Sequence, residues 1–160
     1  MKTIKSFSGK YRFLSNFYLS TITIKHLEFN CVEQVYQCAK TTNAFDYNKI
    51  YNEYSPGKQK KLGSKVEMEK NWEQVKVGVM FNAVLLKFMQ NEKLRKQLIE
   101  TDDAILIEGN TWGDVFWGKC DGKGKNWLGR ILMIVRSLVA NPYFENMTTS
   151  KLTTIKRRKK

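Results

Sequence analysis

The chain has 160 residues, and its 28 Lys and Arg against 15 Asp and Glu give a formal net charge of +13. This length predicts one domain, and 42% hydrophobic residues are enough to build a core, which excludes intrinsic disorder for most of the chain. No stretch reaches the roughly 18 apolar residues of a membrane helix, and the first residues lack the apolar middle of a signal peptide. We therefore expect a soluble cytoplasmic protein.

The first half of the chain mixes a strand pattern with helical patterns. Residues 17–29 are rich in aromatic and β-branched residues, which predicts a strand or hairpin. Asn30 and Glu33 have the spacing of a capping box and predict a buried helix up to Lys40. Further helices are predicted from Ser55-Pro56 and over 71–90 and 92–100.

The second half begins with a predicted buried strand at 104–108. Residues 109–125 are rich in Gly, Trp and Lys, which is typical of a long functional loop. A last helix follows from Asn126 and ends at Asn141-Pro142. This mixture predicts an α+β fold, compact and mainly helical, with a small β-sheet.

About half of the positive excess lies in residues 151–160. The sequence from 147 onward has no apolar period, which predicts a domain over 1–146 and a flexible basic tail over 147–160. The basic tail and surface suit a nucleic-acid partner, because Lys and Arg neutralise phosphates. A merely solvated basic surface is the alternative.

Cysteine and histidine contents argue against a metal site. Cys31, Cys38 and Cys120 are odd in number and form no CxxC pair, and His26 is the only histidine. They are typical of reduced intracellular thiols rather than of a disulfide framework or a zinc site. We expect neither a metal nor another cofactor.

Three polar residues share one face of the predicted helix at 30–40. Glu33, Gln37 and Lys40 are spaced by four and three residues, among apolar neighbours. A partly desolvated carboxylate has a raised pKa and is suited to proton transfer in a pocket. The alternative is structural, with Glu33 completing the capping box and Lys40 ending the helix in solvent.

The glycine-rich loop suits a phosphate-bearing ligand. Its glycines allow close backbone approach, Lys119, Lys123 and Lys125 add positive charge, and a helix N-terminus at Asn126 is a natural anion site. The spacing of a P-loop is absent.

The same loop carries a carboxylate and indole rings. Asp114 is a second candidate carboxylate, and Trp112 and Trp117 offer stacking surfaces. The alternative has the tryptophans packed in the core and Asp114 capping a turn. Near the N-terminus, Ser15 and Asn16 lie between aromatic residues after Arg12, as in a ribose or base pocket or in a simple turn.

Taken in order, these segments resemble the NADAR family, named for NAD and ADP-ribose, which includes N-glycosidases of riboflavin-biosynthesis intermediates. The matching pieces span most of residues 7–139 and include FLSNFY at 13–18, VEQVYQCAK at 32–40, DVFWG at 114–118 and KGKNWLGRILMIVR at 123–136.

The resemblance implies a compact α+β fold and cleavage of an N-glycosidic bond to ribose. It implies catalytic roles for Glu33, Asp114 and Lys40. The substrate-binding residues that it implies are Asn16, Phe17, Gln37, Trp117, Gly118, Asn126 and Gly129. Ser64 stands where the family often has Arg, and we expect Lys65 to replace that phosphate contact.

The chemistry fits these residues. Breaking a ribosyl C–N bond passes through an oxocarbenium-like centre, which one carboxylate can stabilise while another group protonates the leaving nitrogen. Lys40 would orient Glu33, contact phosphate or act as an amine nucleophile.

The net charge helps to rank the substrates. The +13 charge favours ADP-ribose attached to guanine in nucleic acid or nucleotides over phosphoribosyl-aminopyrimidine intermediates of riboflavin synthesis. A non-catalytic module that binds ADP-ribose or nucleic acid is the alternative of another class.

Overall fold

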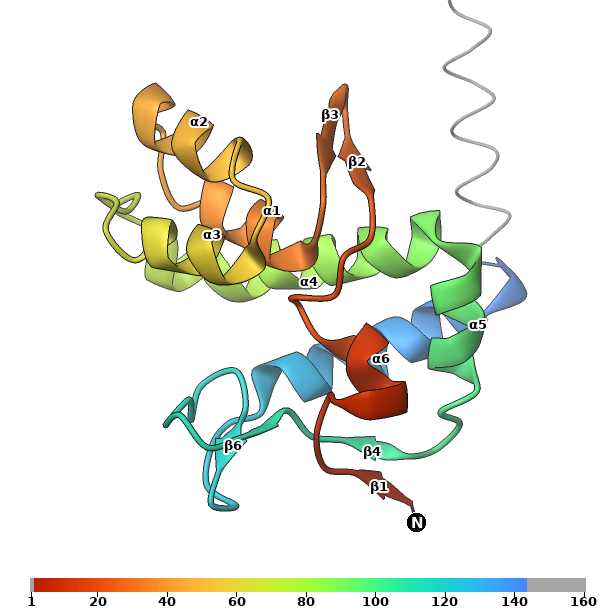
Figure 1. Cartoon of the computed structure of the whole chain (residues 1–160). Helices are drawn as coiled ribbons and strands as arrows, with labels where there is room; N and C mark the ends of the chain where they lie inside the picture. Colours follow the sequence, from red (N-terminus) through yellow and green to blue (C-terminus); the bar gives the residue numbers. More distant parts are fainter. Residues whose placement is uncertain (1, 144–160) are drawn as a thin grey trace, which may run out of the picture.

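The computed structural model describes residues 2–143. Residues 144–146 of the predicted domain, and the whole predicted tail at 147–160, lie outside the described residues. Within them the predicted α+β fold is confirmed, because helices predominate and the strands form only short pairs (Figure 1). None of the described helices is long and apolar enough to cross a membrane.

The core is organised around α4 (Trp72–Gln90), which packs against both α1 (Val32–Cys38) and α6 (Trp127–Ala140). Figure 1 shows α4 running through the centre of the molecule. Helical spacing explains this contact, since the buried side chains recur every three or four residues. They are Met80, Ala83, Val84 and Phe88 on α4, and Leu128, Ile131, Leu132 and Val135 on α6.

A group of shorter helices lies on the other side of α1. α3 (Pro56–Gly63) confirms the helix predicted after Ser55, although it ends three residues before the predicted segment PGKQKKLGSKV at 56–66 does. α2 (Ala44–Tyr51) has no counterpart among the sequence predictions. Only Ile50 of α2 is buried, so its apolar period is weak. The available signal was Asn43, whose Oδ1 accepts hydrogen bonds from the first-turn amides of α2.

The strands form three separate two-stranded pairs within the described residues. β2 (Ile22–Ile24) and β3 (Leu27–Phe29) make an antiparallel hairpin, which confirms the predicted hairpin for this part of 17–29. β1 (Thr3–Ile4) pairs in parallel with β4 (Ile105–Leu106), and β5 (Gly109–Asn110) with β6 (Lys119–Cys120). The predicted strand at 104–108 is therefore present but shorter.

The remaining elements are a one-sided helix and a 3-10 helix. α5 (Glu92–Ile99) confirms the predicted helix at 92–100 and buries Leu94 and Leu98. The 3-10 helix η1 (Gly9–Leu14) was not predicted and precedes the Ser-Asn-Phe segment.

The start of α1 differs from the predicted capping box. The N-cap is Cys31, whose Sγ accepts a hydrogen bond from the Gln34 amide at 3.4 Å. Gln34 Oε1 in turn accepts a hydrogen bond from the Asn30 amide at 2.7 Å. The prediction of a box between Asn30 and Glu33 is therefore wrong, because Gln34 makes the return contact. Glu33 is free of any capping role.

Candidate active site

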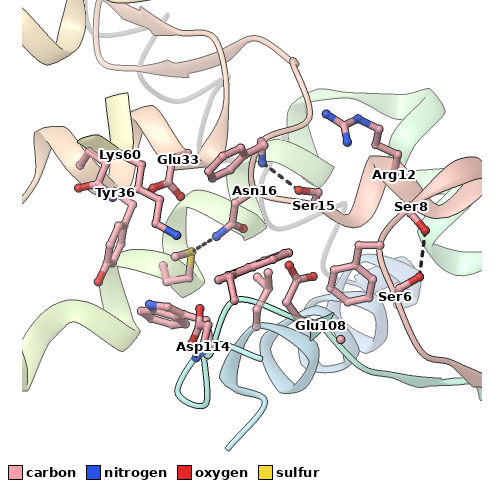
Figure 2. Close-up of a pocket in the computed structure, with 18 of the residues that line it drawn as sticks. Ser6, Ser8, Arg12, Ser15, Asn16, Glu33, Tyr36, Lys60, Glu108 and Asp114 are labelled. Carbon is pink, nitrogen blue, oxygen red and sulfur yellow. Dashed lines mark hydrogen bonds between the residues drawn. The ribbon is translucent and has the colours of Figure 1, made fainter. Parts of the chain in front are cut away.

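A pocket of about 660 Å³ lies between the N-terminal segment, α1, α3 and the loop after β4. Its volume is in the range of small-molecule sites. The structure brings most of the predicted site residues together in its wall, as Figure 2 shows for several of them. These are Asn16, Phe17, Glu33, Gln37, Lys40, Asp114 and Trp117.

Glu33 lies on the pocket face of α1 and is only 5% exposed. Gln37, one helical turn later, donates a hydrogen bond from Nε2 to Glu33 Oε1 at 2.6 Å. Burial raises the pKa of Glu33, while this hydrogen bond and the charges of Lys60 and Lys40 oppose the rise. The arrangement is a desolvated carboxylate held by a donor and facing two cations.

Lys40 lies directly after the C-cap of α1 and continues the same row. Its Nζ donates to the carbonyl of Gly63 at 3.4 Å and lies 5.4 Å from the centroid of the Tyr36 ring. Burial lowers the pKa of Lys40, and the charge of Glu33 acts against that change. The predicted row of Glu33, Gln37 and Lys40 thus faces the pocket together.

Asp114 lies in the pocket wall but is partly committed to its own loop. Its Oδ1 accepts hydrogen bonds from the amides of Phe116 at 3.0 Å and Trp117 at 2.8 Å. Asn110 fixes the Asp114 backbone through two further hydrogen bonds. The turn-capping alternative is therefore confirmed for Oδ1, although the residue also lines the pocket.

The two loop tryptophans differ in their packing. Trp117 is half-buried and meets the Tyr36 ring edge-on, with centroids 5.4 Å apart. Trp112 is 65% exposed, so the alternative that places it in the core is wrong. Both line the pocket and offer aromatic surface to a ligand.

Glu108 is a pocket residue for which the sequence predicts no role, although it ends the piece LIE at 106–108, which also resembles the NADAR family. It follows β4 and lines the pocket, and its Oε2 is buried with no hydrogen-bond partner among the described residues. Burial, and secondly the charge of Asp114, raise the pKa of Glu108 to about 7. The signals in the sequence were this match and the position of an acidic residue at the end of a buried strand, directly before a glycine-rich loop.

Three predicted binding residues are absent from the pocket wall and contact the chain that carries Glu108. Asn126 Oδ1 accepts a hydrogen bond from the Glu108 amide at 3.0 Å, and its Nδ2 donates to the Leu106 carbonyl at 2.9 Å. A Cβ at Gly118 would lie 2.2 Å from the Glu108 carbonyl oxygen, and one at Gly129 would lie 2.2 Å from that of Leu106. These contacts make Gly118, Asn126 and Gly129 supports for Glu108.

The cations of the pocket are also not those expected from the loop. Lys119, Lys123 and Lys125 are absent from the wall, which instead contains Arg12, Lys40 and Lys60. Ser64 lines the pocket, and Lys65, expected to replace the family's Arg, does not. In Figure 2, Lys60 lies beside Glu33 and Tyr36, whereas Arg12 lies near Ser8 at the other end. These pocket cations, rather than the loop lysines, are the positive charges available to an anionic ligand.

Several buried polar atoms of the wall have no hydrogen-bond partner among the described residues. They are Asn16 Oδ1, Gln37 Oε1 and Glu108 Oε2. Buried polar atoms are nearly always paired, so unpaired ones in a pocket indicate where a ligand or water binds. No group of three His, Cys, Asp or Glu positioned to hold a metal ion occurs in the part of the chain that the structure describes.

Gly63 supports the Glu33 site from α3, which leads to a testable prediction. A Cβ at this position would lie 2.0 Å from Gln37 Oε1, so Gly63→Ala should displace the Gln37 side chain and remove its hydrogen bond to Glu33. Because such bonds to charged groups contribute about 1.5–3 kcal/mol, we expect kcat/KM to fall about 10- to 100-fold. The measurement is the steady-state rate of N-glycoside cleavage, the reaction that the family resemblance implies, with thermal unfolding as a check on folding.

The matched control is Gly57→Ala on the same helix, where an added Cβ meets nothing within 4 Å. This variant should keep full activity. Equal activity of the Gly63 and Gly57 variants would contradict the supporting role of Gly63.

Comparison with known proteins shows the family of the chain. The model of the NADAR domain matches residues 4–140. The chain belongs to the NADAR family. It is 35% identical over 138 residues to N-glycosidase YbiA of Escherichia coli, an alignment that covers 84% of the chain and 86% of that protein. It is 34% identical over 137 residues to an N-glycosidase of Nostoc punctiforme, covering 82% of the chain and 87% of the relative.

One further relative and one solved structure are also similar to the chain. A riboflavin biosynthesis protein of Vibrio vulnificus is 35% identical over 127 residues, and the alignment covers 78% of the chain but only 34% of that protein. The NMR structure of E. coli YbiA superposes with a TM-score of 0.79 at 33% identity, covering 88% of the chain and 87% of YbiA. The NADAR fold is thus confirmed, and these names support N-glycosidase activity, that of a glycosyl hydrolase.

Proposed function

We propose that the protein hydrolyses the N-glycosidic bond between a base and ribose in ADP-ribose or ribose phosphate, with ADP-ribosyl-guanine in nucleic acid or nucleotides as its main substrate. The observation that carries the proposal is the environment of Glu33. It is a buried carboxylate held by Gln37 in a pocket that also contains Lys40 and Lys60. Such a group can stabilise an oxocarbenium-like centre or activate water.

The proposed catalytic groups are three side chains of the pocket wall. Glu33 acts at C1′, and Asp114 lies in the same wall as a second acidic group. Lys40 is half-buried with a lowered pKa, so it can orient Glu33, contact phosphate or attack the opened sugar as an amine. No metal or cofactor is needed for these steps.

Binding is shared between aromatic, amide and cationic groups. Phe17 and Trp117 offer ring surfaces for a base, and Asn16 and Gln37 offer amide oxygens that lack partners among the described residues. Arg12 and Lys60 supply positive charge for phosphates. Gly118, Asn126 and Gly129 belong to the proposed binding region through the support that they give to Glu108.

The net charge of +13 supports a polymeric substrate, because nucleic acid is attracted by a basic surface. The basic residues at 151–160 would add to this attraction, although they lie outside the described residues. Location in the cytoplasm is part of the proposal, because Cys31, Cys38 and Cys120 are free thiols, as in reducing compartments.

A second candidate substrate is a phosphoribosyl-aminopyrimidine intermediate of riboflavin synthesis. The name of the Vibrio vulnificus relative favours it. A pocket with cations near both ends would hold a ribose phosphate without any polymer.

The experiment compares both substrate classes directly. The full chain is incubated with an ADP-ribosylated guanine oligonucleotide and, separately, with ribosylated aminopyrimidine phosphates, and released ADP-ribose or ribose phosphate is measured by mass spectrometry. We expect release from the oligonucleotide, with a KM that rises with salt. Faster release from the pyrimidines would favour the second candidate. Binding without release from any substrate would leave a non-catalytic binding module as the function.

A further inference from the structure

We propose that Glu108 is the acid that protonates the leaving nitrogen when the N-glycosidic bond breaks. This inference rests on the proposed function and gives the role of proton donor to Glu108 rather than to Asp114. The reason is the different use of the two side chains. Asp114 Oδ1 already accepts two backbone amides, whereas Glu108 Oε2 is buried in the pocket wall without a partner among the described residues.

The position of Glu108 is fixed by its backbone rather than by its carboxyl group. Its amide donates to Asn126 Oδ1, and its carbonyl accepts a hydrogen bond from the Lys119 amide at 2.8 Å. Gly118 and Gly129 allow the neighbouring chain to approach this segment closely. A side chain held in this way keeps its direction while its carboxyl group stays available to a ligand.

Burial, and after it the charge of Asp114, favour the protonated form of Glu108. Asp114 repels a negative charge there, and Lys60 is the cation that acts against this effect. Arg12 lines the same pocket near its other end. Burial raises the pKa of Glu33 as well, but there the Gln37 donor and the charges of both Lys60 and Lys40 act against the rise and favour the carboxylate. Two carboxyl groups in such different surroundings are suited to opposite roles as acid and base.

The reaction balances with these two groups. The C1′–N electron pair moves to the base nitrogen, which takes the proton of the Glu108 carboxyl group. Water adds to C1′ and gives a proton to the Glu33 carboxylate. Exchange with solvent returns the proton to Glu108, so one water is consumed for each bond cleaved. In one view, Figure 2 shows Glu33 and Glu108 on either side of Asn16.

The test is Glu108→Gln in the full chain, compared with Glu67→Gln at an exposed position as the control. On a base-bearing substrate cleaved by the wild type, we expect kcat/KM to fall about 10²- to 10⁴-fold. The wild-type kcat/KM should decline above pH about 7 as Glu108 loses its proton. The Gln variant should lose this alkaline decline, and Glu67→Gln should match the wild type in both respects.

A second substrate separates a proton donor from a merely structural residue. In 4-nitrophenyl riboside 5-phosphate, the leaving group 4-nitrophenolate departs without taking up a proton. Glu108→Gln should therefore cleave this substrate nearly as fast as the wild type does. Equal losses on both substrates in a folded variant, or an unchanged alkaline decline, would overturn the inference. If the wild type cleaves no N-glycoside at all, the proposed function itself fails, which is a different result.

Discussion

Glu33→Gln should lower kcat for N-glycoside hydrolysis by about 10²- to 10⁴-fold. The Kd for the substrate should stay close to that of the wild type. The amide is nearly the same shape as the carboxyl group, but it carries no negative charge to stabilise an oxocarbenium-like centre and takes no proton from water. Single-turnover release of ribose phosphate or ADP-ribose measures the chemical step, and ligand binding is measured separately by calorimetry.

The control for this prediction is Glu28→Gln on β3, where the side chain is exposed. It removes the same charge from the surface and should leave both kcat and affinity unchanged. A Glu33→Gln protein that keeps wild-type turnover would show that Glu33 is no catalytic group. Burial destabilises the charged form of Glu33, and the uncharged Gln avoids this effect. The variant should therefore be at least as stable to unfolding as the wild type near neutral pH.

The second large effect concerns Lys87, a lysine of α4 that is only 1% exposed. Its ammonium donates to the backbone carbonyls of Phe13 at 2.6 Å and Ser15 at 2.9 Å, so it holds the segment that leads to Asn16. Burial lowers the pKa of Lys87 to about 7, whereas an unfolded lysine titrates at about 10.4. Between these two values the unfolded chain binds more protons than the folded one, so this lysine makes stability rise with pH.

We therefore expect the free energy of unfolding of the wild type to rise relative to Lys87→Met by up to about 1.4 kcal/mol per pH unit above pH about 7. At pH 6 the lysine is charged in both the folded and the unfolded chain, and its burial is then most unfavourable. The stability of Lys87→Met relative to the wild type should therefore be highest at pH 6. Urea unfolding of both proteins at pH 6, 7, 8 and 9 measures the difference. Lys93→Met, at an exposed site on α5, should show no such trend. A constant difference between wild type and Lys87→Met would contradict the prediction.

Local patterns in the sequence predicted the helical part of the site well. The spacing of Glu33, Gln37 and Lys40 places them on one face because α-helix geometry depends only on neighbours along the chain. The prediction of Asn30 as the N-cap is wrong because the next residue, Cys31, is the N-cap and Gln34 makes the return hydrogen bond. A thiol is a weak acceptor and is rarely considered as a cap.

The parts that sequence could not predict depend on contacts between distant segments. Glu108 enters the pocket because β4 is placed by its pairing with β1, and no period along the chain reports such a pairing. Similarly, the family motif marks Asn126 and Gly129, but only their contacts with the chain at Leu106 distinguish support from ligand binding. Lys119, Lys123 and Lys125 were expected at the pocket because they are close to Asp114 in the sequence. In the structure they do not line the pocket.

The parallel pairing of β1 with β4 also has a consequence for how the protein is made. Thr3 lies opposite Ile105, so the first strand has no partner until that much of the chain has left the ribosome. The part of the pocket wall that directly follows β1, at Ser6 to Ser8, is therefore fixed late, after a long loop has closed at an entropic cost. A nascent chain that contains Glu33 but not yet β4 would have no second wall, so hydrolysis should begin only when synthesis has passed the Glu108 segment.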